Sequence, residues 1–383
     1  MSHFTVLVIG EDHETQLAPY HEFECTGHVD EYVQTVEKTG ELREAYNTSK
    51  VDRLMFSDGR MITTYDDSVY RDLTPEEKDK IGDNIGGGMG TRDGIFFFSK
   101  DWGDGKGYRP KVRDISILPV VEVSVPCKEI QTFLEYIREH HSEGIPVIPQ
   151  GSEPDLEGDC KWGWIESDDE GNITRVTERT NPNAKWDWYS VGGRWTGFFP
   201  VKEGAQGEAG TPGVFGGRAA PGTADRLRWG DVDIERARQE ARDKANKDFD
   251  DWGKCFTEHG IAQSWKEILD AHKNTGKEGV ETARALYRSQ SVIQAFDKMN
   301  PRFWGCPVDT FGFDRDAYVQ GKVNQTLVPF ALLKDGEWYQ RGDMGWWGVA
   351  RNEMDRDEWA KQVSTLLDSL DPDTIVTIVD CHI

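Results

Sequence analysis

The chain has 383 residues, of which 69 are acidic and 45 are basic, so its formal net charge at pH 7 is −24. This acidic excess argues against a general nucleic-acid binder, because neutralising phosphates requires lysine and arginine, and against attachment to an anionic membrane surface. The hydrophobic fraction is only 37%, but 14 tryptophans, 17 phenylalanines and 11 tyrosines supply the apolar area for a packed core, and no stretch approaches the ~20 apolar residues that span a bilayer.

The first half of the chain is expected to alternate strands with helices. Residues 3–9 are apolar and β-branched, which predicts a buried strand that stops at Gly10, and the absence of a basic flank argues against a signal peptide. Thr74 before Pro75 predicts the start of a short helix over 74–82. Further along, the pattern predicts strands over 94–102 and 115–125, an amphipathic helix over 127–141 and a hairpin over 161–179.

The second half changes character twice. Residues 192–201 predict a strand, and residues 202–230 are rich in glycine, alanine and proline, which is typical of a flexible linker. Residues 231–300 predict three charged helices. The remaining elements are expected to be strands over 326–334 and 337–340, an amphipathic helix over 355–370 and a closing strand over 373–383.

These elements predict an α+β fold, with helices covering a mainly antiparallel sheet and a ferredoxin-like core that carries a helical insertion. The core domain is expected to comprise residues 1–201 and 301–383, with 202–230 as the linker and 231–300 as the insertion. The first and last strands are the most continuous β-branched runs, so both are expected in one central sheet.

The stretch NPNAKWDWYSVGGRW has two interpretations. In the structural one, its three tryptophans pack between sheet and helices, and the glycine pair permits a bulge. In the functional one, Trp186, Asp187, Trp188, Arg194 and Trp195 form a ligand-binding slot that grips a planar ring. Because strand residues alternate between faces, Trp186 and Trp188 are expected to share one face and to be structural. Arg194 and Asp187 are then the expected contact pair for any ligand.

A second candidate is the stretch PYHEFECTGH, in which His21, Cys25 and His28 have the spacing H-x3-C-x2-H. Zinc favours nitrogen and sulfur ligands of this kind, but the pattern matches no established zinc finger. The alternative is an ordinary turn in which Cys25 is a small buried hydrophobe. No fourth ligand is evident nearby, but pairing of the terminal strands would make Asp380, Cys381 and His382 available as candidates and would bring His3 close as well.

Other chemical signals are weak. The glycine-rich loop over 83–94 lacks the spacing of a phosphate cradle, and the loop over 101–110 lacks the ligands of a calcium loop. No nucleophile elbow or HExxH motif occurs. Whether the protein is an enzyme is therefore left open, and no cofactor is expected apart from the zinc hypothesis.

The chain resembles a family of uncharacterised proteins encoded by tailed bacteriophages and prophages. The resemblance rests on MSHFTVLVIG, PYHEFECTG, NPNAKWDWYSVGGRW, GTADRLRWGDVDIERAR, MGWWGVARNEMDRDEWAKQ and TIVTIVDCHI, and it spans nearly the whole chain. It implies a phage-related origin and expression in a bacterial cytoplasm. It carries over no catalytic residue.

Two classes of function follow. The first is a phage-encoded acidic accessory protein of the cytoplasm that binds a host or phage macromolecule, most simply a protein. The alternative is a small-molecule-binding protein, or an enzyme, that acts on a planar nucleotide-like ligand around 186–195. Direct nucleic-acid binding and membrane contact are not expected, and the oligomeric state is left open. Free thiols in a reducing compartment are expected, because the six cysteines are widely spaced and form no CxxC pair.

Overall fold

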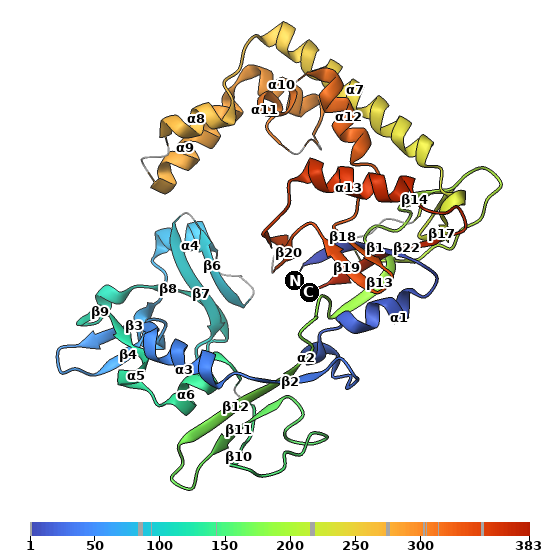
Figure 1. Cartoon of the computed structure of the whole chain (residues 1–383). Coiled ribbons are helices and arrows are strands. Elements are labelled where there is room, and N and C mark those ends of the chain that lie inside the picture. The colour runs from blue at the N-terminus through green and yellow to red at the C-terminus, as the bar shows by residue number, and fades with distance from the viewer. Residues whose placement is uncertain are drawn as a thin grey trace. The chain divides into compact units, whose positions relative to one another are not determined.

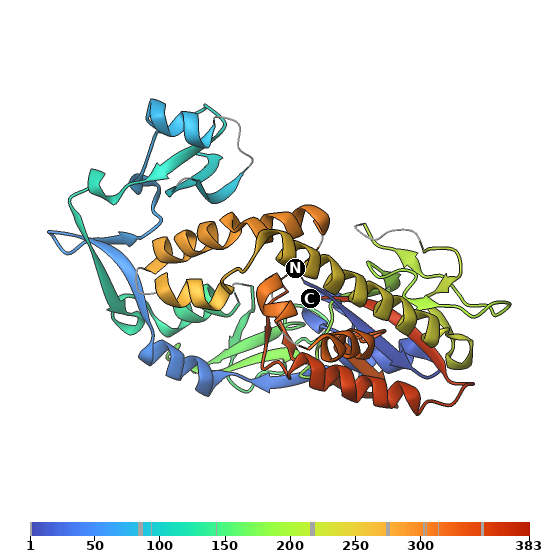
Figure 2. The same cartoon turned by 90° about the horizontal axis from the view of Figure 1, so that it is seen from above.

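The computed structural model describes residues 2–82, 87–92, 94–142, 144–214, 219–272, 276–301, 303, 305–312, 314–345 and 348–383. The chain divides into two compact units (Figure 1, Figure 2). Unit 1 comprises Met1–Val33 and Asn181–Ile383, and unit 2 comprises Gln34–Thr180. This division differs from the expected domain boundaries, which joined residues 34–180 to the core.

The central sheet of unit 1 is built on the two ends of the chain. β1 (His3–Ile9) and β22 (Ile375–His382) pair antiparallel over seven residues, as expected from their apolar, β-branched character. On one side, β22 also pairs with β13 (Trp188–Gly193) and β17 (Arg226–Arg228), and β15 (Thr211–Pro212) lies beyond β13. On the other side, β1 pairs in parallel with β18 (Ala331–Lys334), which continues into β19 (Glu337–Gln340).

Each face of this sheet has its own apolar core, because successive strand residues point to opposite sides. On one face, Leu7, Val376 and Ile378 pack with Trp359 and Val363 of α13 (Arg356–Asp368). The other face carries a second cluster, which includes Phe4, Val6, Val379, Cys381, Leu17 of α1 (His13–Leu17) and Trp186.

The α+β class is confirmed, but the strand order is not ferredoxin-like. In a ferredoxin-like sheet an antiparallel strand separates the two parallel ones, whereas here β1 and β18 pair directly and β19 takes the edge. The expected strand over 192–201 is also wrong, since β13 ends at Gly193. The expected helix over 127–141 is two helices, α5 (Cys127–Ile130) and α6 (Phe133–His140), because Thr132 caps the second one.

The helical part of unit 1 extends further than expected. It has its own core, in which Trp252, Ile293, Phe296 and Phe311 are buried. None of the helices in the described ranges combines the length and apolar character needed to cross a bilayer. The helices are α7 (Ile234–His259), α8 (Trp265–His272), α9 (Gly276–Ser289), α10 (Ser291–Met299), α11 (Pro307–Phe311) and α12 (Arg315–Asn324).

The described part of the expected linker, residues 202–214 and 219–230, is tied into the fold. β17 pairs with β22, and β16 (Thr223–Ala224) pairs with β14 (Phe199–Pro200). Asp225 has no exposed surface, and its carboxylate accepts hydrogen bonds from the backbone N–H groups of Gly197, Phe198 and Gly210. The glycines of this segment therefore permit close packing.

The described residues of unit 2 form three small sheets and several short helices. In α4 (Pro75–Ile81), Thr74 forms the expected N-cap: its side chain accepts a hydrogen bond from the Glu77 backbone N–H, and the Glu77 side chain accepts one from the Thr74 backbone N–H, which makes a capping box. The helix α3 (Thr39–Thr48) packs on α5 and α6. The first sheet contains β10 (Val147–Pro149), β11 (Gly163–Ser167), β12 (Ile173–Thr180) and β2 (Gln34–Glu37). The second sheet contains β4 (Met61–Thr63), β3 (Lys50–Phe56) and β9 (Val120–Pro126). The third sheet contains β5 (Tyr70–Arg71), β8 (Tyr108–Arg113), β7 (Ile95–Asp101) and β6 (Gly88–Arg92).

The glycine pair at the end of β13 is required by two buried carboxylates of unit 1. Gly192 and Gly193 have φ of 78° and 54°, in the left-handed region that favours glycine. A Cβ at Gly192 would lie 2.7 Å from an Asp225 carboxylate oxygen, and a Cβ at Gly193 would lie 2.3 Å from the Asp380 Cβ. The chain therefore turns away from the sheet here, which ends the strand.

Gly193→Ala is expected to lower the free energy of unfolding by about 3 kcal/mol, because left-handed backbone strain and a steric clash with Asp380 add together. Gly204→Ala is the control: Gly204 also has positive φ, 81°, but nothing lies within 4 Å of its Cβ position. The control should cost only about 1 kcal/mol. Urea titrations followed by circular dichroism measure both, and equal losses would contradict the close approach to Asp380.

Candidate functional site

Polar side chains gather where β1, β22 and β13 lie side by side at one end of the central sheet. His3 pairs with His382, and His382 with Trp188, so these residues share one face. Asp380 lies two residues from His382 on the same face. We call His3, Asp187, Trp188, Asp380 and His382 the polar edge. This face is apolar further along the strands, where α13 covers it.

Two carboxylate–imidazole pairs form the polar edge. His3 Nδ1 lies 2.8 Å from an Asp380 carboxylate oxygen, whose partner oxygen accepts a hydrogen bond from the Arg194 backbone N–H at 2.9 Å. His382 Nδ1 lies 2.7 and 2.8 Å from the two Asp187 oxygens. Asp380 is 1% and His382 5% exposed. Each imidazole is therefore oriented by a carboxylate at its Nδ1 atom. Histidines that use Nε2 for catalysis or metal binding are commonly oriented in the same way.

Aromatic rings complete the polar edge. The Trp188 ring stacks on the His382 ring, with centroids 5.1 Å apart and planes inclined by 18°. The His3 ring meets both of these rings edge-on. Because 45% of Trp188 remains exposed, its ring offers a planar surface to a ligand.

A group of potential metal ligands adjoins the polar edge. Glu22 and Cys25 stand one turn apart at α2 (Phe23–Thr26), and their ligand atoms and that of Asp187 all lie within 4.8 Å of one another. We call Glu22, Cys25 and Asp187 the donor cluster. The backbone holds it together: Glu22 N–H donates to the Trp186 carbonyl at 2.6 Å, and Asp187 N–H to the His382 carbonyl at 3.0 Å.

The pKa values of two members of the donor cluster, Glu22 and Cys25, are raised by their surroundings. Burial, followed by repulsion from Glu24 and Asp187, raises the pKa of Glu22. Burial, followed by repulsion from Glu22 and Asp187, raises the pKa of the Cys25 thiol. A thiol with a raised pKa is a poor nucleophile at neutral pH, so the geometry does not favour cysteine catalysis.

The five residues expected to form one aromatic slot do not come together as a set, although Asp187 and Trp188 both contact His382. Trp186 is buried, and its Nε1–H donates to the Leu17 carbonyl at 3.1 Å. Trp188 lies on the other face of the sheet with His3 and His382, because the strand begins only at Trp188. The expectations that the two tryptophans share a face and that Trp188 is core are wrong. Asp187 joins the polar edge, while Arg194 is exposed and Trp195 half-buried.

The residues His21, Cys25 and His28 do not converge on one point. His21 Nε2 lies 3.1 Å and His28 Nε2 3.9 Å from the same oxygen of Asp30. Cys25 belongs to the donor cluster instead. Gly27 ends α2 in a left-handed conformation, which separates His28 from Cys25. The expected pairing of the terminal strands does bring His382 to this region, although as the partner of Asp187.

The six cysteines form no disulfide, as expected. The glycine-rich loop over 83–94 lies partly outside the described residues, and most of its described part belongs to β6 (Gly88–Arg92). Sequence reasoning missed Glu22 as a potential metal ligand and missed the contact of Asp187 with His382. No local motif signals that contact, since the two residues are 195 positions apart.

Comparisons with protein-family models, with curated proteins and with solved structures each found no match. The resemblance to tailed-bacteriophage proteins, the bacterial cytoplasmic setting and the macromolecular partner therefore stay predictions.

Trp186 and Trp188 are expected to differ sharply on truncation. Trp186→Ala should lower the free energy of unfolding by about 3–5 kcal/mol, because it empties a buried site. Trp188→Ala should cost about 1 kcal/mol, because nearly half of the residue is exposed and only its ring contacts with His382 and His3 are lost. Urea titrations followed by circular dichroism test this. A loss at Trp188 as large as that at Trp186 would contradict its placement at the surface.

Proposed function

We propose that unit 1 is a zinc-type metal-binding module whose donor cluster, Glu22, Cys25 and Asp187, holds the ion. The observation that carries this proposal is the mutual approach of three ligand atoms to within 4.8 Å. In a tetrahedral zinc site with bonds of about 2.0–2.3 Å, neighbouring ligand atoms stand roughly 3.5 Å apart. Small side-chain rotations would therefore suffice to close the site.

Charge and ligand type support a transition metal. The donor cluster places two carboxyl groups and a thiol together, and burial, followed by their mutual repulsion, raises the pKa values of Glu22 and Cys25. A bound dication removes that repulsion and deprotonates the thiol. A sulfur ligand suits zinc and related ions better than magnesium or calcium, which prefer oxygen alone.

The surroundings support a site that is open to a ligand. His382 contacts the Asp187 carboxylate through Nδ1. Residues that hydrogen-bond to a metal ligand in this way orient that ligand toward the ion. Cys25 is exposed, so one side of the cluster faces solvent. Three protein ligands with one open position are typical of zinc sites that act on substrates. We propose that a small ligand binds at this position, with the exposed Trp188 ring as a contact surface for a planar group.

Zinc affinity is expected to fall at least tenfold in Cys25→Ser, measured by competition with a chromophoric chelator. The cobalt-substituted protein should show a thiolate charge-transfer band that this variant lacks. Because the ligands bind the metal in deprotonated form, affinity should fall as pH is lowered, starting at a higher pH than for ordinary Glu and Cys groups.

Cys160→Ser is the matched control, because Cys160 is a buried thiol of unit 2 outside the cluster. It should retain native affinity and the cobalt band. His382→Ala should weaken zinc binding 10–100-fold, because it removes the side chain that orients the ligand Asp187. Native protein that binds zinc no better than Cys25→Ser would refute the proposal.

A further inference from the structure

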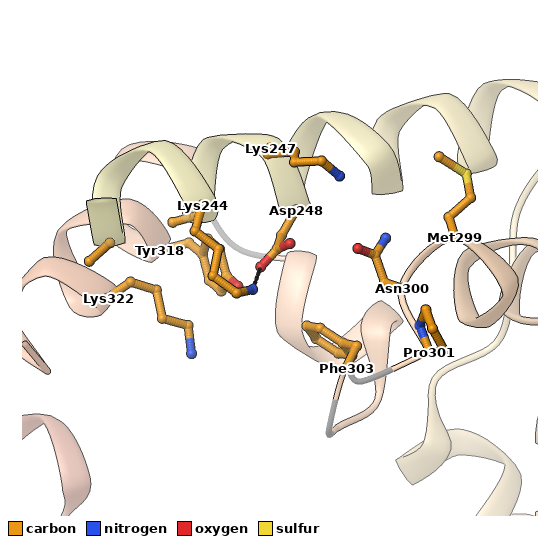
Figure 3. A pocket seen from close by; sticks show the side chains of 11 residues that line it. Lys244, Lys247, Asp248, Met299, Asn300, Pro301, Phe303, Tyr318 and Lys322 are labelled. Atoms are coloured by element: carbon orange, nitrogen blue, oxygen red, sulfur yellow. Dashed lines mark hydrogen bonds and ion pairs between the residues drawn. The ribbon is translucent and has the colours of Figure 1, made fainter. Parts of the chain in front are cut away.

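A cavity of about 590 Å³ lies among the helices of unit 1 (Figure 3). It is lined by α7, by the end of α10 with the residues that follow it, and by α12. This volume falls within the ~300–1,000 Å³ typical of small-molecule sites. Apolar surface comes from Met299, Pro301, Phe303 and the Tyr318 ring, and the Asn300 amide adds a hydrogen-bonding group.

The lysines that line the cavity differ in their pairing. Lys244 Nζ lies 2.6 Å from an oxygen of Asp248, and Lys247 forms an ion pair with Asp251, each one helical turn apart on α7. Lys322 comes from α12, and within the described residues its ammonium has no ion-pair or hydrogen-bond partner. Its Nζ instead lies 5.3 Å from the centre of the Tyr318 ring. Figure 3 shows Lys322 extending toward the hollow that Lys244 and Asp248 face from α7.

The surroundings of Lys322 disfavour the protonated, charged form of its side chain. Burial, followed by repulsion from Arg356 and Lys244, lowers the pKa of Lys322, while Asp248 and Asp357 act in the opposite direction. Burial and then Asp248 raise the pKa of Tyr318 to about 12, so this phenol stays neutral. A half-buried ammonium without a counter-ion is costly, and an anionic ligand would relieve that cost.

We infer that this cavity binds a small organic acid, with its carboxylate on Lys322 and its apolar or aromatic body against Tyr318, Phe303 and Met299. One unpaired cation matches one negative charge. The Asp248 carboxylate on the same cavity wall disfavours a dianion, and phosphate monoesters carry close to two charges at pH 7. A carboxylate is therefore favoured over a phosphate. This inference is independent of the metal proposal, which concerns other residues.

The test uses three probes on the full chain, by calorimetry or ligand-observed NMR: 3-phenylpropionate, its uncharged amide and phenyl phosphate. The acid should bind in the millimolar range or tighter, and both other probes at least tenfold more weakly. Lys322→Gln should lose at least tenfold in affinity for the acid, and Lys322→Arg should stay within threefold because it keeps the charge. Lys298→Gln, at an exposed lysine of α10 that does not line the cavity, should bind like the native chain.

A pH series supplies a second readout. Acid binding needs the protonated ammonium, so affinity should hold at lower pH and fall as pH rises through the Lys322 pKa, which lies below the ordinary lysine value. Absence of 3-phenylpropionate binding up to 10 mM, equal binding to native protein and Lys322→Gln, or phenyl phosphate binding as tight as the acid would overturn the assignment. If Lys322→Gln does not fold, the proposal is still tested on native protein by the ratio of its affinities for 3-phenylpropionate and the amide and by the pH series.

Discussion

The antiparallel pairing of β1 with β22 is the constraint on which unit 1 depends. Its register sets His3 opposite His382 and Thr5 opposite Asp380. A slip of β22 by one residue would turn Asp380 and His382 to the opposite face of the sheet. Cys381 would then lie on the face that carries His3. The apolar residues at the other end of both strands prevent that slip, since they pack on α13 and on the Trp186 face. Hydrophobic pairing therefore positions the carboxylate–imidazole pairs.

Two buried carboxylates fix the backbone around this sheet. An ionised side chain that leaves water must find hydrogen-bond donors. Asp225 accepts from three backbone N–H groups, and Asp380 accepts from His3 and from the Arg194 N–H. These bonds need the backbone to approach closely, which is why Gly192 and Gly193 cannot carry a Cβ. The Gly-Ala-Pro composition after residue 201 predicts a mobile linker, but its described residues are tied into the fold by the pairing of β16 and β17 and by the hydrogen bond from the Gly210 N–H to Asp225.

Much of the fold was predictable because its signals are local. A continuous apolar, β-branched run identified β1, a capping threonine identified α4, and an amphipathic pattern identified α13. The strands expected over 326–334 and 337–340 correspond to the β18–β19 hairpin. The candidate site was not predictable in the same way. Trp186 precedes the strand that begins at Trp188, so alternation could not be applied across the pair. The left-handed Gly27 removes His28 from Cys25, and Asp187 reaches the cluster only through tertiary pairing.

Local pairing, and not net charge, determines what each site of unit 1 attracts. On α7, the buried Asp248 and Asp251 are each neutralised by a lysine four residues earlier, as the helical repeat allows. Asp248 is therefore paired within its own helix, and no carboxylate of the described residues forms an ion pair with Lys322 of α12, which lines the cavity. The donor cluster has the opposite imbalance, since Glu22 and Asp187 adjoin a thiol. We therefore propose both a cation site and an anion site within the described part of a chain whose net charge is −24, because the field at a few ångströms depends on the nearest groups far more than on the distant surface charge.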